Sequence, residues 1–494
     1  MNGTFILLTI VAYFGLLLLI ARLTGARHAD NEAFFRGNRQ SPWYVVSFGM
    51  IGASLSGVTF VSVPGMVRFI DMTYMQTCLG FFFGYCVIAR VLLPLYYRLN
   101  LTSIYTYLGR RIGSRAYTTG ASFFLLSKLL GASARLYLVC LILQHFVLDA
   151  LGIPFAVTAV GTVLLIWFYT HRSGIRTIVW TDSLQTFCLL AALALILYQV
   201  LALLQLDGGE TVDLIAQSPH SRIFVFDDLQ SKQNFFKQFF SGIFITIVMT
   251  GLDQDMMQKN LSCRNLKEAQ KNMLCYGISF VPVNFLFLSL GILLLAAAGQ
   301  LGLDVPAKGD DLLPMFAANG HLGAAVLVFF TIGIIAAAFS SADSALAALT
   351  TSCCIDLLRI GRYDEAKAHR IRLWVHVGIA AVFVACILVF EAIGSQSVID
   401  TIYVLASYTY GPLLGLFGLG LFTRCRPRDR YVPYVAVAAP LLSYAIERWV
   451  FVSTGYQFGY ELLMLNGLLT FTGLYLLGVR CPHSLPDSDE NTTI

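Results

Sequence analysis

Residues Thr331–Ser352 read TIGIIAAAFSSADSALAALTTS and lie in an apolar run that begins near His321. A run of this length predicts a membrane-spanning helix. Helical spacing places four residues along one face of that helix: Ala337, Ser340, Ser341 and Ser344. Asp343 stands beside this face, and an aspartate at the centre of a membrane helix costs about 2.5–3.5 kcal/mol, so it needs a partner or a wet cavity. Hydroxyls and a carboxylate suit a sodium ion, although small residues of this kind also pack membrane helices together.

The composition of the whole chain agrees with a membrane protein. Of 494 residues, 57% are hydrophobic and 12% are charged, and the mean hydropathy is +0.72. These values are typical of a polytopic, all-α membrane protein in contact with a lipid bilayer. The net charge of +5 is attributed to membrane topology, and no nucleic-acid partner is expected. The eleven cysteines show no metal-type pairing, and no nucleophile–base pair stands out, so we do not expect an enzyme.

The apolar runs predict thirteen transmembrane helices. Their ranges are 3–22, 43–66, 73–97, 116–148, 152–170, 177–204, 235–254, 273–299, 321–350, 373–391, 397–422, 431–452 and 459–479. Most of the 33 lysines and arginines lie in loops that follow odd-numbered spans. The positive-inside rule therefore predicts an N-terminus outside the cell and a cytoplasmic C-terminus.

Two of these spans contain residues that interrupt a helix. The second span includes GASLSGVTFVSVPG (Gly52–Gly65), and the seventh includes SGIFITIVMTG (Ser241–Gly251). Paired broken helices in corresponding halves are typical of transporters built from inverted repeats. The two interruptions lie five spans apart, and a repeat with this odd number of spans makes the two halves antiparallel.

Charged residues inside other spans extend the predicted site. The orientation places Asp182, in the sixth span, at the same cytoplasmic depth as Asp343. The two carboxylates favour a cation site, but they could instead pair with Lys or Arg, or carry protons. Lys128 and Arg135 lie seven residues apart on one face of the fourth span. The guanidinium of Arg135 could bind a substrate carboxylate through two hydrogen bonds. Alternatively, it could form an ion pair with an aspartate of the protein or reach into an aqueous vestibule.

Several stretches together resemble the sodium:solute symporter family, which includes sodium–glucose, monocarboxylate, iodide and bacterial sialic acid transporters. The most specific stretch is GLDQDMMQKNLSCRNLKEAQKN (Gly251–Asn272). Four other stretches are also similar to the family, and the similarity runs along nearly the whole chain in the same order. From the N-terminus they are GASLSGVTFVSVPG, LPLYYRLNLTSIYTYLGRR, SGIRTIVWTDSLQ and AAAFSSADSAL. The resemblance implies a LeuT-type inverted-repeat (5+5) core with one leading and two trailing helices. The implied segments are 1–42 (leading helix and loop), 43–204 (first repeat), 205–234 (extracellular loop), 235–422 (second repeat), 423–479 (trailing helices) and 480–494 (cytoplasmic tail).

The resemblance also implies functional residues. A principal sodium site would use the side chains of Ser340 and Ser341 with the backbone carbonyls of Ala337, Gly52 and Leu55. A second sodium, bound by some members of the family, would involve Asp182, Ser340, Ser344 and Asp343, although Asp343 stands where a neutral ligand is expected. The substrate pocket would be lined by Ser54, Ser56, Thr59, Gln76 and Arg135.

The leading hypothesis is a symporter of the inner (cell) membrane that uses one or two sodium ions to import a small organic anion, such as a sialic acid or another monocarboxylate. A neutral sugar or polyol symporter is the first alternative, and proton coupling is another. A ligand sensor built on a symporter core is a hypothesis of a different class. We expect the protein to be a monomer.

Overall fold

Helices occupy the apolar ranges expected from the sequence. The computed structural model describes residues 3–24, 39–149, 152–170, 175–318, 322–393 and 398–480. Most of the expected loop after the first span, and the C-terminal tail, lie outside these residues. A ligand sensor is expected to have a fused or docked cytoplasmic output domain, and the tail is the segment on which that hypothesis was judged.

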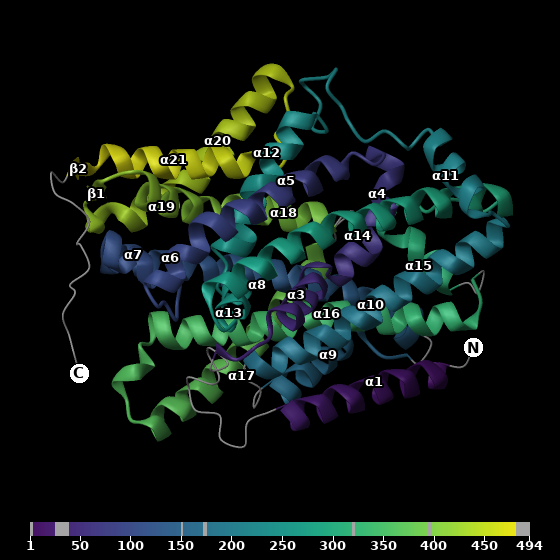
Figure 1. The fold of residues 1–494 in the computed structure, drawn as a ribbon, viewed down its shortest axis with the longest axis horizontal. Coiled ribbons are helices and arrows are strands. Elements are labelled where there is room, and N and C mark those ends of the chain that lie inside the picture. The colour runs from purple at the N-terminus through teal and green to yellow at the C-terminus, as the bar shows by residue number, and fades with distance from the viewer. Residues whose placement is uncertain are drawn as a thin grey trace.

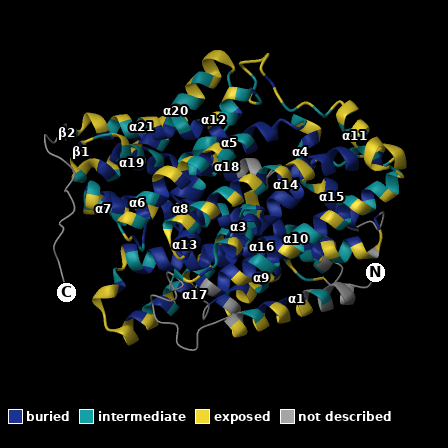
Figure 2. Ribbon diagram, viewed as in Figure 1, coloured by how far each residue is buried: buried dark blue, intermediate teal, exposed yellow. Residues whose placement is uncertain are grey.

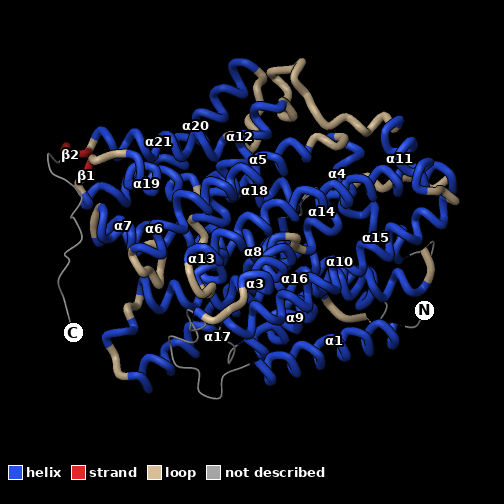
Figure 3. The backbone as a smooth tube through the Cα atoms, in the orientation of Figure 1, coloured by secondary structure: helices blue, strands red, loops and turns tan. Residues whose placement is uncertain are grey.

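The described part of the chain is almost entirely helical (Figure 3). The α-helices are α1 (Gly3–Thr24), α3 (Trp43–Ser54), α4 (Gly57–Ile70), α5 (Tyr74–Val87), α6 (Leu93–Arg98), α7 (Thr106–Arg111), α8 (Ser114–Leu143), α9 (Phe155–Thr170), α10 (Ile175–Leu204), α11 (Gly208–Gln217), α12 (Phe235–Thr246), α13 (Gln254–Leu261), α14 (Leu266–Leu301), α15 (Leu312–Ala318), α16 (Ala324–Ser352), α17 (Glu365–Ile393), α18 (Val398–Thr409), α19 (Gly411–Phe422), α20 (Val432–Thr454) and α21 (Leu462–Leu476). Short π-helical turns continue α5, α8, α12 and α16. Strands β1 (Cys425–Pro427) and β2 (Gly478–Arg480) form one small antiparallel pair.

Helix length and polarity support a multi-pass membrane protein. Within the described residues, 7 helices are long and apolar enough to cross a membrane, or up to 10 if each of three bent pairs is one span. Three shorter apolar helices occupy the remaining expected ranges: Val11–Ile20, Phe155–Phe168 and Leu462–Leu476. Two of them belong to helices shorter than the about 20 residues that usually span a bilayer, α9 with 16 residues and α21 with 15, whereas the whole of α1 has 22.

The helix with the serine-rich face lies at the centre of the molecule. In the most apolar segment of α16, 72% of the residues are buried, whereas 17% are buried in the corresponding segment of α20. Helix α16 packs against α10, α8 and α4, whereas α1 lies along one side of the molecule and α20 and α21 along the other (Figures 1 and 2). Outer helices expose large apolar side chains such as Leu164, Trp374 and Val452. This pattern is expected where lipid, rather than water, surrounds the protein.

Both interruptions expected from the sequence are present. Helices α3 and α4 meet at 56°, and α12 with its π-turn meets α13 at 66°. The second bend falls at residues 252 and 253, just beyond the predicted Ser241–Gly251, because Asp253 caps a new helix by accepting from the N–H groups of Asp255 and Met256. The carbonyl groups freed at this bend accept hydrogen bonds from Tyr96 and Tyr105, at 2.9 Å each. A third bend of 45°, between α18 and α19, was not predicted.

Candidate functional site

The break between α3 and α4 lies directly against α16. Helix α3 ends at Ser54, where the Leu55 N–H donates to the carbonyl of Ile51 at 2.8 Å. The last carbonyls of an α-helix have no intrahelical donor, so they are free for other partners. The Ser341 hydroxyl of α16 donates to one of them, the carbonyl of Ala53, at 3.2 Å. The central serine pair is therefore joined to the interruption in the second predicted span.

A glycine is required where α3 approaches α10. The Gly52 N–H donates to Oγ1 of Thr186 at 3.1 Å. A Cβ atom on Gly52 would lie 2.1 Å from the same oxygen and 3.0 Å from the Cα of Thr186. This close approach fixes the C-terminal turn of α3 against α10, and with it the direction of the freed carbonyls.

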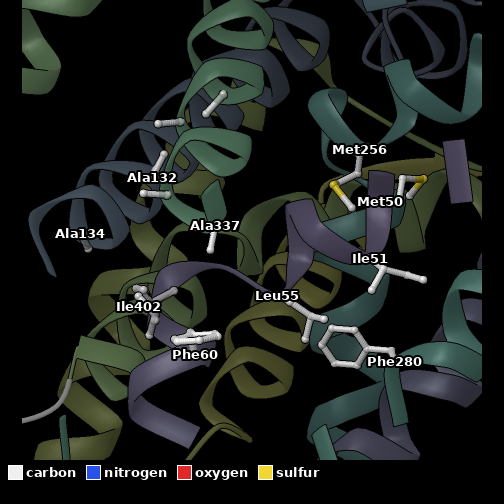
Figure 4. Close-up of a cluster of buried hydrophobic side chains, with 14 of the residues drawn as sticks. Met50, Ile51, Leu55, Phe60, Ala132, Ala134, Met256, Phe280, Ala337 and Ile402 are labelled. Carbon is white, nitrogen blue, oxygen red and sulfur yellow. The ribbon is translucent and has the colours of Figure 1, made fainter. Parts of the chain in front are cut away.

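The residues predicted for the principal sodium site are buried near one another. Figure 4 shows Leu55, at the interruption, in the same apolar cluster as Ala337 of α16. Ser341 and the end of α3 supply hydroxyl and carbonyl oxygens, which are the ligand types that sodium takes in broken-helix transporters. These donors fit the ion. Ser340, in contrast, donates its hydroxyl elsewhere, to Oδ1 of Asp182 at 2.6 Å.

A second cluster forms around Asp182 and contains a cation of the protein itself. The ammonium of Lys259, on α13, lies 2.7 Å from Oδ2 of Asp182 and 3.9 Å from Oδ1 of Asp255. Ser344 donates to the backbone carbonyl of Ser340 at 2.7 Å. The structure therefore brings together the Asp182, Ser340 and Ser344 predicted for a second sodium, with an ion pair between Asp182 and a lysine.

Asp343 belongs to the same fully buried region. Its Oδ1 accepts from the N–H of the next residue, Ser344, and its side chain is within electrostatic range of Lys259. Sequence reasoning did not assign a role to Lys259, although it is part of the motif Gly251–Asn272. The spacing of Asp255 and Lys259, four residues apart on one helix, was the available signal.

A central cavity of about 100 Å³ lies beside the broken helices. Its walls come from α3, α5, α8, α12, α13, α14, α16 and α18. Ser341 is one of the lining residues, so the cavity and the predicted principal sodium site share a side chain. Ala132, Met256, Phe280 and Ile402 form part of its apolar wall (Figure 4).

Two cations line this cavity, and their surroundings differ. The ammonium of Lys128 lies 3.2 Å from Asp253 and 2.7 Å from Asp255, and Tyr410 donates to the Asp253 carboxylate at 2.7 Å. Arg135 lies on the same helix, lines the same cavity and is half-buried. Among the residues that the structure describes, Arg135 forms no ion pair. Lys128 is thus neutralised internally, and Arg135 is the positive charge presented to the cavity.

The residues predicted to bind substrate are only partly brought together. Ser54 lines the cavity and is hydrogen-bonded to the hydroxyl of Tyr276. Ser56 and Thr59 are buried on the α4 side of the break and are not cavity-lining residues. Gln76 also lies outside the cavity wall, where it accepts from the N–H of Val225 at 3.1 Å and donates to the carbonyl of Gln233 at 2.9 Å.

Four tyrosines of the cavity wall escaped sequence reasoning: Tyr85, Tyr276, Tyr403 and Tyr410. Their hydroxyl groups are hydrogen-bonded to the protein: Tyr410 donates to Asp253, Tyr85 and Tyr276 are bonded to each other, and Tyr403 is bonded to Tyr74. The chain contains 23 tyrosines, so no local signal distinguished these four from tyrosines of the core.

Two solved structures share the fold of this chain. A sodium-coupled sialic acid symporter in a substrate-bound, outward-open state aligns with a TM-score of 0.82 at 18% identity, over 96% of this chain and 99% of that one. Mhp1, a nucleobase-cation-symport-1 family transporter, aligns in a closed conformation with a TM-score of 0.58 at 13% identity, over 91% and 95% of the two chains. The chain thus has the LeuT-like fold that these two structures share.

Sequence comparison identifies the family. The profile of the sodium:solute symporter family matches residues 34–426, and the chain belongs to this family. It is 24% identical over 476 residues to the sodium/sialic acid symporter NanT of Aliivibrio fischeri (strain ATCC 700601 / ES114), covering 92% of this chain and 89% of that protein. It is 24% identical over 483 residues to human sodium-coupled monocarboxylate transporter 1, covering 91% and 74%. These relatives are transporters rather than enzymes.

Proposed function

We propose that this symporter couples the entry of sodium to the uptake of a small organic anion, with Arg135 as the group that binds the substrate carboxylate. The observation that carries this proposal is the contrast between the two cavity cations. Lys128 has two carboxylate partners at 2.7 and 3.2 Å, whereas Arg135 forms no ion pair with any described residue. A half-buried guanidinium without a counter-ion gains most from a planar carboxylate, which it can bind through two parallel hydrogen bonds.

The volume of the cavity bears on which anion is carried. Typical ligand pockets measure about 300–1,000 Å³, and the cavity here is about 100 Å³. A short monocarboxylate matches this volume, whereas a sialic acid requires the surrounding helices to move apart. The class of substrate that we propose is therefore a monocarboxylate, with short chains first and sialic acids second.

Ser341 supports a direct coupling between the ion and the substrate. The principal sodium is assigned to Gly52, Leu55, Ala337, Ser340 and Ser341, and Ser341 also lines the cavity. An ion held between α16 and the end of α3 would order one wall of the pocket and raise substrate affinity. By thermodynamic reciprocity the substrate would raise sodium affinity by the same factor. Inward movement of sodium supplies about 2.3 kcal/mol per charge for each 100 mV of membrane potential.

The proposed arrangement has thirteen spans. The first five-helix repeat runs from α3 to α10 and the second from α12 to α19, so that each repeat begins with a broken helix. Helices α11 and α15 lie at one end of the molecule, and α7, β1 and β2 at the other (Figure 1). The second end carries Arg110, Arg111, Arg424 and Arg426, which supports a cytoplasmic location for it and for the C-terminus.

A neutral sugar or polyol is the second candidate substrate. The four tyrosines of the cavity wall favour it, because they are uncharged and a phenolic hydroxyl can exchange its present protein partner for a hydroxyl of the substrate.

Uptake by proteoliposomes distinguishes the two candidates. An inward sodium gradient should drive the uptake of labelled acetate, lactate or N-acetylneuraminate, and Arg135→Met should raise the KM for these anions at least tenfold. The matched control is Arg448→Met, which removes an exposed arginine of α20 and should change nothing. Transport of neutral sugars alone, unaffected by Arg135→Met, would overturn the anion proposal.

A further inference from the structure

Both oxygens of the Asp182 carboxylate are engaged by groups of the protein. Oδ1 accepts the Ser340 hydroxyl at 2.6 Å, and Oδ2 lies 2.7 Å from the ammonium of Lys259. These contacts join three elements, since Asp182 is on α10, Ser340 on α16 and Lys259 on α13. The carboxylate predicted to bind a second sodium is thus already paired with a monovalent cation.

The side chain of Lys259 is buried among carboxylates, in surroundings typical of a bound cation and not of a lysine at the protein surface. Its side chain is 1% exposed, and the side chains of Asp182 and Asp255 are 0% and 5% exposed. Buried carboxylates require a compensating cation, because an unpaired charge costs several kcal/mol in such surroundings. Lys259 supplies that charge from within the chain, at hydrogen-bonding distance from the oxygen that a sodium ion would also need.

We infer that the ammonium of Lys259 is a tethered cation that occupies the second sodium position, so that this symporter couples one sodium ion, rather than two, to each substrate. The inference rests on the proposed sodium coupling and refines it. The ammonium of Lys259 lies against one oxygen of Asp182 and Ser340 donates to the other, so a sodium ion at this carboxylate would lie next to a fixed positive charge and be repelled by it. A second sodium can bind only when Lys259 is removed.

Counting bound sodium in variants of Lys259 tests the inference without any substrate. Labelled sodium binding to the purified full-length protein should show one ion per chain in the native protein and two in Lys259→Met, with the Hill coefficient rising from about 1 to about 2. The thermal stability of Lys259→Met should also depend more steeply on sodium than that of the native protein. Lys259→Arg keeps the tethered charge and should bind one ion.

The double variant Lys259→Met/Asp182→Asn is the matched control. It removes the carboxylate as well as the ammonium and should return the count to one. Two sodium ions bound to the native protein would overturn the inference, as would a single ion bound to Lys259→Met. The count for the native protein decides the question even if the single variant fails to fold. Absence of sodium binding in every variant would overturn the sodium coupling itself, which is a separate result.

Discussion

The ammonium nitrogen of Lys259 lies 2.7 Å from Oδ2 of Asp182, and this contact fastens the half-helix α13 to α10. The half-helix begins at the break of the second interrupted span, and its first turn also holds Asp255, a partner of Lys128 on α8. Two ion pairs from one face of the helix therefore hold α13 in place, one to α10 and one to α8. Because both are buried, any movement of α13 during transport must exchange these partners for others.

Breaking the pair from the carboxylate side should destabilise the protein. Removing one member of a buried ion pair typically costs roughly 3–5 kcal/mol, and the cost for Asp182→Asn should lie at the lower end, since Asp255 remains 3.9 Å from Lys259. We expect a Tm several degrees lower in detergent, with partial recovery in Asp182→Asn/Lys259→Met. An unchanged Tm in the single variant would show that the contact contributes no stability.

The two cations of the cavity should respond differently to removal. Lys128→Met leaves Asp253 without its lysine partner and Asp255 with only Lys259, at 3.9 Å, so it should lower the Tm markedly and reduce transport. Arg135→Met removes a charge that has no ion-pair partner among the described residues, so it should leave the Tm nearly unchanged while raising the KM. Thermal unfolding and initial uptake rates, measured on both variants, check this contrast. Equal losses of stability would contradict the division of roles.

Gly52→Ala should prevent the close packing of α3 on α10. The added Cβ would meet Thr186 at 2.1 Å, and overpacking of this kind typically costs about 1–3 kcal/mol or more. We expect a lower Tm and a weaker response to sodium. Gly161→Ala on α9 is the control, because a Cβ added there would meet nothing within 4 Å. Equal behaviour of the two variants would show that the approach of Thr186 does not matter.

Ser341→Ala should weaken sodium binding without unfolding the protein. It removes the hydroxyl that we propose as a sodium ligand and the hydrogen bond to Ala53 at 3.2 Å, so the sodium concentration for half-maximal uptake should rise at least tenfold, or about 1.4 kcal/mol. Ser443→Ala on α20, which removes a bond to the carbonyl of Ala439 at 2.8 Å, should leave that concentration unchanged. A native sodium response in Ser341→Ala would remove this residue from the site.

Much of the fold could be predicted because each membrane span is a local signal. The apolar ranges correspond to helices, and the Gly- and Ser-rich stretch at Gly52 marks a real break. The bend before α19 was missed, although the dipeptide Gly411–Pro412 is a local signal for one. The count of thirteen spans remains a prediction, since α9 and α21 are shorter than a usual membrane span.

Site residues that belong to recognisable sequence motifs could be predicted. Contacts between segments that are far apart in the sequence could not. The convergence of Asp182 with Ser340 followed from the resemblance of two motifs to one family. The pairing of Asp182 with Lys259 depends on how α13 packs against α10, and no spacing within either segment predicts it. Gln76 shows what a resemblance leaves open. It was placed in the substrate pocket by resemblance to the family, and in the structure its side chain is hydrogen-bonded to the backbone of the loop residues Val225 and Gln233.

Sodium-dependent thermal stabilisation tests the central claim most directly. The purified protein and Arg135→Met would be heated with and without sodium in the presence of short carboxylates, sialic acids, sugars and amino acids. The account predicts that carboxylates raise the Tm of the native protein only when sodium is present, and that Arg135→Met loses this response. Stabilisation by neutral sugars that is independent of sodium and unchanged in Arg135→Met would contradict it.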